Sequence, residues 1–418
     1  MLSRRALLGG FPLLATAQRR PNVLVFMSDQ ESAVLPGPVN APNHRRLDRE
    51  GVRFTQAFCN TPQCSAARSS LLTGLEPHQT GVVTNVDGSS LGKGLSPTLP
   101  TIGHVFREAG YRTGYFGKWH LGPEADGREA FGFSTTGRGK DEAVAEKAAA
   151  WIEKQSGPWL AWVSILNPHD IYHIVDDLKT VAVRRGVSAP FSDQTNLAGK
   201  PPEQQQYMDK DQGRAAKDYT PQDWLRYRTY YCELIEKADA CLGTVLSAIG
   251  DPGATVIAYT ADHGDGIGEH GLPFKGPFMY EPLIRIPLVI SAPGRLMPET
   301  RDDLVTQADL SPTLASLAGL KWPSKVTGLD LTRQKNARDA VFLEYYSKQK
   351  WVNPIRTIRT GRWKLNWYDS GHEELYDLES DPHELRNLVG DGNFGAERTR
   401  LEARLNAWRG PLSAVPGR

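Results

Sequence analysis

The sequence predicts an α/β fold with a large, mostly parallel central sheet, followed by a small C-terminal domain. Two observations predict the large sheet: apolar runs of strand length recur along the chain, and helical segments separate them. The apolar runs cover residues 22–29, 111–116, 159–166, 255–260 and 286–291. Their continuity is typical of strands that are buried on both faces, although the run at 111–116 is more polar than the others. The helical segments cover residues 98–109, 141–155 and 222–249.

A change in composition after Leu320 predicts the C-terminal domain. Short aromatic runs at 341–346 and 363–367 have strand character, which favours a small antiparallel sheet. A last helical pattern covers about residues 396–408. We therefore expect a main domain over residues 20–330 and a small C-terminal subdomain over residues 335–418.

Residues 172–220 interrupt the alternation of strands and helices. The segment is polar and contains Pro190, Pro201, Pro202 and three consecutive glutamines. Two interpretations fit it equally: a structured insertion or lid beside a functional site, or a plain surface excursion.

The composition limits the classes of function. The chain has 418 residues with 39% hydrophobic and 23% charged residues, which suits a soluble globular protein. The formal net charge is +1, so no overall field attracts nucleic acid or a membrane surface. The chain contains only four cysteines, too few to form a disulfide framework. We expect Cys232 and Cys241 to pack in a helix.

The N-terminus predicts a secretory signal peptide over residues 1–17. Arg4 and Arg5 precede a short apolar stretch, and small residues at 15–17 form a cleavage site. The arginine pair resembles a twin-arginine signal, although a chance pair in an ordinary signal is the alternative. The stretch is too short for a stable membrane anchor. We expect an exported protein, periplasmic or extracellular.

Polar side chains follow four of the predicted strands. The ends of these strands carry Asp29, Lys118, His120, His169, Asp262 and His263. Ligands of open α/β sheets bind outside the carboxyl ends of the strands, so we expect these groups to share one edge. Asp29 and Asp262 are hard oxygen ligands for a divalent cation, although each alone could cap a helix.

Cys64 begins a second notable run, which ends at Gly74. A helix that starts beside the cysteine places Cys64 and Arg68 on one face, at positions i and i+4. A helix N-terminus favours an anion, so cysteine, arginine and an anion site converge there. The alternative is a buried cysteine in an ordinary helix.

Several of these runs resemble the motifs of type I sulfatases, a branch of the alkaline phosphatase superfamily. Residues 64–74 resemble the signature Cys-x-Pro/Ala-x-Arg followed by Leu-Thr-Gly, residues 117–122 resemble the Gly-Lys-Trp-His element, and residues 262–271 resemble the second metal motif. The tail at 374–384 is also similar to that of sulfatases. The resemblance runs in order from about Arg20 to Leu388, and it implies an alkaline-phosphatase-like sandwich with sulfuric ester hydrolase activity.

The resemblance also implies the roles of individual residues. Cys64 would be oxidised to formylglycine, the nucleophile, which Arg68 would hold together with the neighbouring metal ligands. Lys118 and Lys275 would bind sulfate oxygens, His120 would bind the formylglycine hydroxyl, and His169 would protonate the leaving group. The implied metal is calcium, with ligands Asp29, Gln30, Asp262, His263 and the converted Cys64.

The chain departs from the commonest pattern of the family at three positions. Gln30 replaces an aspartate and His263 replaces an asparagine, so the metal site has fewer negative charges and its metal identity is open. Ala66 replaces a proline. An alanine at this position resembles the substrates of the radical-type maturase more than those of the oxygen-dependent one. A formylglycine-generating maturase is therefore an expected partner.

The expected substrate is a sulfated small molecule or glycan, because an exported setting favours a carbohydrate. His78, Tyr172, His173 and the 172–220 segment are candidates for contacting it. One alternative is a phosphonate or phosphate ester hydrolase of the same superfamily. Another is an inactive protein that binds sulfated glycans with an unmodified Cys64.

Overall fold

A computed structural model describes residues 20–86, 92–122, 128–191, 197–323, 325–333, 335, 337–348 and 351–409. The predicted signal peptide at 1–17 lies outside these residues. None of the helices within them combines the length and the apolar character that a membrane crossing requires.

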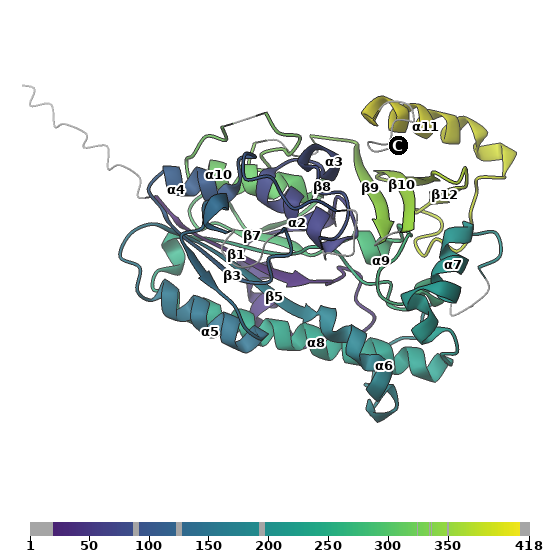
Figure 1. The fold of residues 1–418 in the computed structure, drawn as a ribbon, viewed down its shortest axis with the longest axis horizontal. Helices are drawn as coiled ribbons and strands as arrows, with labels where there is room; N and C mark the ends of the chain where they lie inside the picture. Colours follow the sequence, from purple (N-terminus) through teal and green to yellow (C-terminus); the bar gives the residue numbers. More distant parts are fainter. Residues whose placement is uncertain are drawn as a thin grey trace, which may run out of the picture.

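An eight-stranded sheet forms the centre of the larger part of the molecule (Figure 1). The strands are β1 (Asn22–Asp29), β2 (Val52–Phe58), β3 (Arg112–Gly117), β4 (Thr135–Gly137), β5 (Trp159–Pro168), β6 (Thr255–Ala261), β7 (Leu288–Ser291) and β8 (Glu299–Thr306). Their order is β4-β3-β5-β1-β6-β7-β2-β8. All neighbours are parallel except β7, which is antiparallel to β6 and to β2. The prediction of a mostly parallel sheet is confirmed.

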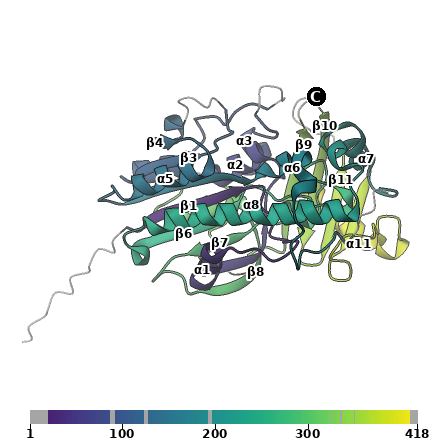
Figure 2. The same ribbon diagram turned by 90° about the horizontal axis from the view of Figure 1, so that it is seen from below.

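Helices cover both faces of this sheet. The helices of the chain are α1 (Pro42–Glu50), α2 (Cys64–Thr73), α3 (Pro77–Thr80), α4 (Ile102–Glu108), α5 (Asp141–Ile152), α6 (Ile174–Asp177), α7 (Pro202–Lys210), α8 (Pro221–Ser247), α9 (Glu281–Ile284), α10 (Leu310–Leu317) and α11 (Gly395–Arg409). Figure 1 shows α2, α4 and α10 on one face and α5 and α8 on the other. In Figure 2 the long α8 lies across the face that is seen from below.

The continuous apolar run of β1 follows from its position in the middle of the sheet. Val23, Val25 and Met27 pack into the core under α2, α4 and α10, while Leu24 and Phe26 pack into the core under α5 and α8. Successive side chains of a strand point to opposite faces, so a strand covered on both sides needs apolar residues at every position.

The sequence pattern missed β2 and β8. β2 contains the exposed Arg53 and the half-buried Thr55 and Gln56, and β8 is the last strand of the sheet. An edge strand is covered less than a central one, so the polar first half of β8 does not resemble the central strands.

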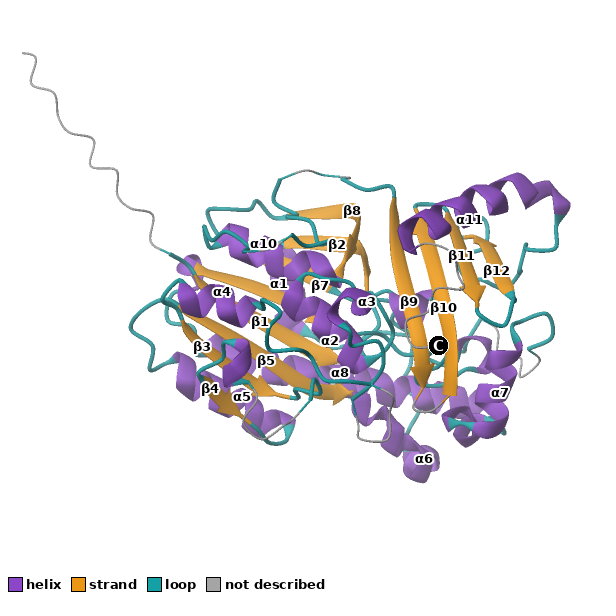
Figure 3. Ribbon diagram, turned by 45° about the horizontal axis from the view of Figure 1, so that its top comes forward, coloured by secondary structure: helices purple, strands orange, loops and turns teal. Residues whose placement is uncertain are grey.

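A second sheet follows, with strands β9 (Ala340–Lys348), β10 (Trp351–Thr360), β11 (Trp363–Tyr368) and β12 (Glu373–Asp377). It is antiparallel throughout, in the order β12-β11-β10-β9. Leu401 and Leu405 of α11 pack on Ile358 and Leu365 of this sheet. Figure 3 shows the second sheet beside the first, with α11 next to it. The predicted antiparallel sheet and terminal helix are confirmed.

A polar core joins the second sheet to the rest of the molecule. The buried carboxylate of Glu374 accepts hydrogen bonds from the hydroxyls of Tyr368, Tyr376 and Tyr280 at 2.8, 2.8 and 3.1 Å. The Gln204 amide of α7 also donates to it, at 3.1 Å. A buried carboxylate needs such donors, because burial without partners would cost several kcal/mol. The junction therefore fixes α7 and the second sheet together.

A second contact with α11 involves the half-buried carboxyl of Glu76, the residue before α3. The Trp408 indole N–H donates to Glu76 Oε2 at 2.9 Å, and His78 packs edge-on against the Trp408 ring. Burial raises the pKa of Glu76 to about 7, with His78 opposing the shift and Glu344 adding to it. The ordinary value for this group is 4.5.

We predict that Glu76 makes the stability of the protein depend on pH. Its folded pKa is raised, so its contribution is complete below a pH of about 4.5 and is lost as the pH rises through about 7. The variant Glu76→Gln keeps the acceptor for Trp408 but stays neutral. Thermal unfolding from about pH 5 to about pH 8 should show a shallower loss of Tm in this variant. The exposed Glu50→Gln serves as control and should keep the slope of the parent; an unchanged slope in Glu76→Gln would contradict the assignment.

Candidate active site and metal centre

Neighbouring parallel strands bring their polar ends to one edge of the large sheet. β3, β5, β1 and β6 are adjacent, and their carboxyl ends lead to Lys118, His169, Asp29 and Asp262. β2 runs in the same direction as β6, because both are antiparallel to β7 between them. β2 therefore ends at the same edge, where a short connection leads to Cys64. This is the edge at which open α/β sheets bind ligands.

Cys64 is the first residue of α2. The helix starts after Gln63, which makes no capping hydrogen bond through its side chain, and ends at Gly74 in a left-handed conformation. The sequence pattern predicts one apolar side through Leu71 and Leu72, but all ten residues of the helix are buried. The thiol thus sits at the positive end of a fully buried helix dipole.

Four charged or polar groups surround the thiol. Lys275 Nζ donates to Cys64 Sγ at 3.1 Å and Lys118 Nζ at 3.6 Å. His263 Nε2 lies 3.2 Å from the sulfur, and Asp29 Oδ1 lies 3.8 Å from it. Burial alone would raise the pKa of the Cys64 thiol, but Lys118, Lys275 and His263 outweigh it and hold that pKa well below its usual value. The surroundings of Cys64 therefore stabilise a negative charge on the side chain at this position.

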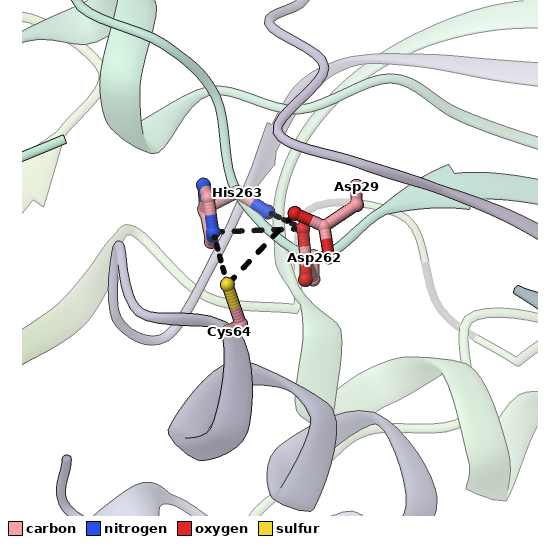
Figure 4. Close-up of side chains that lie close together, drawn as sticks. All are labelled: Asp29, Cys64, Asp262 and His263. Carbon is pink, nitrogen blue, oxygen red and sulfur yellow. Dashed lines mark hydrogen bonds and ion pairs between the residues drawn. The ribbon is translucent and has the colours of Figure 1, made fainter. Parts of the chain in front are cut away.

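Asp29, Cys64, Asp262 and His263 form a compact group of potential metal ligands. One ligand atom from each lies within 4.8 Å of all the others, and all four residues are buried. Figure 4 shows Cys64 at the tip of its helix, pointing at the other three. Carboxylate oxygens suit a hard cation such as Ca²⁺, while imidazole is a softer ligand. The donor set fits a divalent cation held by Asp29, Asp262 and His263.

The guanidinium of Arg68 holds the two carboxylates side by side. Its NH2 donates to Asp29 at 2.7 Å and its Nε to Asp262 at 2.9 Å. Its NH1 donates to the Lys118 carbonyl at 2.7 Å and to Ser164 Oγ at 2.8 Å. Burial raises the pKa of Asp262, and the facing Asp29 raises it further. A divalent cation between these oxygens would relieve that repulsion.

Gln30 lies in the same place but makes different contacts from those that the resemblance implies. Its side-chain oxygen accepts a hydrogen bond from Lys275 Nζ at 2.7 Å, and its amide nitrogen donates to Asp265 Oδ2 at 2.7 Å. Its backbone N–H donates to Asp262 Oδ1 at 3.0 Å, in a left-handed conformation with φ of 73°. Gln30 thus orients Lys275 and Asp262 in this structure, and its role as a metal ligand stays a prediction.

The two predicted histidines line the space in front of Cys64. Both lie in the wall of one cavity together with Cys64, His120 from the segment after β3 and His169 from the end of β5. Burial lowers the pKa of His169 to about 4, and Lys118 and Lys275 lower it further. His169 can therefore be protonated, and so act as an acid near neutral pH, only when a bound anion offsets the charges of Lys118 and Lys275.

A cavity of about 170 Å³ opens in front of Cys64. Its walls are Gln63, Cys64, Asn85, His120, His169, Tyr172, Gln212, Lys275 and Lys348. Tyr172 lies in this wall and stacks on Phe274 at 4.2 Å between ring centres. His173 is largely exposed and His78 packs against Trp408, so neither of these two candidates is among the lining residues.

Some site residues carry no signal in the sequence. Asn85 lies in an irregular loop, Gln212 lies in the 172–220 segment, and Lys348 ends a strand of the second sheet. Each comes to the cavity through tertiary packing rather than through a motif. The presence of Gln212 in the wall shows that the 172–220 segment borders the site.

Comparisons with known proteins agree over most of the chain. A family model described as "Sulfatase" matches residues 21–320, and one described as "N-sulphoglucosamine sulphohydrolase, C-terminal" matches residues 268–410. The Escherichia coli protein named "Uncharacterized sulfatase YidJ" is 30% identical, over 92% of this chain and 86% of that protein. The "Delta 4,5-hexuronate-2-O-sulfatase" of Bacteroides thetaiotaomicron is 28% identical, over 91% of this chain and 87% of that protein.

Solved structures share the fold. A "2-O GAG sulfatase" superposes with a TM-score of 0.82 at 23% identity, over 93% of this chain and 92% of that one. A phosphonate monoester hydrolase of Agrobacterium radiobacter superposes with a TM-score of 0.78 at 24% identity, over 93% of this chain and 95% of that one.

We predict that a divalent cation stabilises the protein through Asp262. Calcium should raise the Tm of the parent, because a ligand present at about 100 times its Kd adds about 2.7 kcal/mol of stability. The variant Asp262→Asn removes one charged ligand and should lose most of this shift. Asp303→Asn is the matched control, since Asp303 is buried but pairs with Arg301 outside the site. Thermal unfolding with and without Ca²⁺ measures the effect, and an equal shift in Asp262→Asn would contradict the proposed site.

Proposed function

The chain belongs to the sulfatase family and is a sulfuric ester hydrolase, and we propose that it is an exported enzyme acting on a sulfated carbohydrate through a formylglycine made from Cys64. The observation that carries the proposal is the position of Cys64. Its sulfur lies within 3.6 Å of two lysine amines and beside a ligand set for a divalent cation. Such a site suits a nucleophile that attacks an anion.

The lysines solve the first problem of the reaction. A sulfate monoester is an anion and repels nucleophiles, so cations on its outer oxygens are needed. Lys118 and Lys275 reach Cys64 from two different segments, and each can hold one sulfate oxygen. When bound, the divalent cation would add positive charge and lower the pKa of a coordinated hydroxyl.

The modified side chain solves the second problem, which is the release of sulfate. The hydrated aldehyde of formylglycine supplies two hydroxyls on one carbon, so that one can attack sulfur and the other can lose a proton to expel sulfate. Arg68 fixes the two aspartates around it, and His120 contacts the same side chain. His169 would protonate the leaving alcohol once the bound sulfate offsets the charge of the two lysines.

The cavity supports a carbohydrate substrate. Its volume of about 170 Å³ lies below the roughly 300–1,000 Å³ of drug-sized ligand sites, so we expect it to take one terminal sugar unit. The stacked ring of Tyr172 offers a flat wall and Asn85 and Gln212 offer amides for hydroxyl groups. The name of the hexuronate sulfatase relative points to the same substrate class.

The proposed cofactors are a divalent cation, Ca²⁺ by preference, and formylglycine. A maturase must convert Cys64, and Ala66 favours the radical type. Export would follow from the segment at 1–17.

The proposal is tested by linking activity to the chemical state of Cys64. We expect preparations that were co-expressed with a radical maturase to carry an aldehyde at position 64 by peptide mass spectrometry, and to release sulfate from an aryl sulfate. Cys64→Ala should lower kcat by about 10³-fold or more. Cys59→Ala is the matched control, because Cys59 is also buried but its sulfur lies at the Leu283 carbonyl, and it should stay active.

Three results would contradict the proposal. Full activity with an intact Cys64 would exclude the formylglycine route. An aryl phosphonate that is cleaved with the higher kcat/KM would favour the phosphonate hydrolase instead. Binding of sulfated glycans without turnover, despite a confirmed aldehyde, would favour the binding protein.

A further inference from the structure

The wall of the active-site cavity contains a cation that the proposed reaction does not use. Lys348, the last residue of β9, belongs to the second sheet and lies in this wall together with Lys275. Among the described residues that line the cavity, none is a carboxylate. We propose that Lys348 binds a second anionic group of the substrate, a carboxylate or a further sulfate, next to the ester that is cleaved. This assignment rests on the proposed function.

The ammonium of Lys348 is held in a fixed place. It pairs with Asp211 Oδ1 at 3.0 Å and donates to the Lys275 carbonyl at 3.4 Å. It lies over the ring of Tyr207, 4.4 Å from the ring centre. A lysine has three N–H donors, so one remains beyond these two acceptors. Because the side chain lines the cavity, that donor can serve a ligand.

The contacts of Lys348 differ from those of the two lysines at the site of the cleaved ester. Lys118 and Lys275 already reach Cys64 Sγ, at 3.6 and 3.1 Å. Lys348 instead donates to the backbone carbonyl of Lys275 and pairs with Asp211, the residue before Gln212 of the cavity wall. A sulfate held by the first two lysines therefore leaves Lys348 to a different group of the same substrate.

Burial makes this cation a better receptor for an anion. The Lys348 side chain is only 12% exposed. Burial lowers the pKa of Lys348 to about 8, and Lys275 lowers it further while Asp211 opposes the shift. An incoming anion would stabilise the charged form, whereas a neutral sugar would not. Charged hydrogen bonds of this kind are stronger than neutral ones.

The alternative is a purely structural role. The pair of Lys348 and Asp211 connects the second sheet to the 172–220 segment, and Asp211 also accepts from the Gln212 N–H at 2.6 Å. A structural tie would affect all substrates alike and would lower the Tm. A receptor for an anion would affect only the substrates that carry one.

The test compares kinetics on three sulfate esters. One is 4-nitrophenyl sulfate, which has no second anion; the others are a sulfated disaccharide with a uronic carboxylate and a disulfated neutral sugar. Of the two substrates with a second anion, we expect one to bind Lys348. For that substrate, Lys348→Met should raise KM by about 10- to 100-fold, as expected on losing a charged hydrogen bond, and should leave kcat nearly unchanged. Activity on 4-nitrophenyl sulfate should change by less than about threefold. The substrate arm that responds identifies the anion as carboxylate or sulfate.

Two further variants make the kinetic result specific. Lys348→Arg keeps the charge and should restore most of the affinity. Lys217→Met is the matched control, because Lys217 pairs with Asp209 on the surface of the same segment and should change nothing. An equal loss on all three esters, or no loss on either acidic one, would overturn the assignment.

A binding measurement separates this assignment from the proposed function. Calorimetry on Cys64→Ala protein, with and without Lys348→Met, compares the same sugars without turnover. A selective loss of affinity for the acidic sugar supports the role of Lys348 even if the aldehyde-bearing parent releases no sulfate, a result that would overturn the proposed function alone. Equal affinities of the two proteins for every sugar would overturn the role of Lys348.

Discussion

The buried contact between Arg68 and the two aspartates is the interaction on which the site depends. Asp29 ends β1 and Asp262 directly follows the adjacent β6, and Arg68 reaches both from the helix that begins with Cys64. All three side chains are at most 1% exposed, so each charge has lost its water. Such a cluster is stable only if it is complete, since removing one partner leaves an unpaired buried charge. The helix, the two strands and the candidate metal ligands are therefore fixed relative to one another.

The second sheet contributes to the site through a similar use of buried polar groups. Glu374 gathers tyrosine hydroxyls and the Gln204 amide, so β12 and α7 are joined by directed contacts. Lys364, also buried, pairs with Glu281 and Glu384. Hydrogen bonds of fixed geometry define an orientation more narrowly than apolar packing does. With the second sheet held in this orientation, Lys348 at the end of β9 lies in the wall of the cavity in front of Cys64.

Much of the fold and part of the site could be predicted from the sequence. The central strand 22–29 is apolar at nearly every position because it has a core on both faces, and its end meets the ends of its parallel neighbours. The tendency of ligand groups to gather at the carboxyl ends of parallel strands is enough to predict that Asp29, Lys118, His169 and Asp262 share one edge. Helix geometry already points to Cys64 and Arg68; the family resemblance adds Lys275 and assigns roles to all three residues, and these roles remain predictions.

The remainder depends on tertiary packing. β2 and β8 carry polar residues because they lie toward the edge of the sheet, so their patterns are weak. The resemblance assigns Gln30 to the metal, but its amide oxygen faces Lys275, an orientation that a local pattern does not encode. His78, a candidate for contacting the substrate, instead packs under α11, because the terminal helix folds back over α3.

The complete burial of α2 has a consequence for how the enzyme would be made. Cys64 is 1% exposed and the whole helix is enclosed by the core, so a second protein cannot reach this side chain once the fold has closed. On the proposed mechanism, the maturase must therefore act before α2 packs. Conversion of Cys64 and folding of the chain would then compete kinetically in each newly made molecule. The proportion of active enzyme in a population would record the relative speed of the two processes, and later exposure to the maturase could not change it.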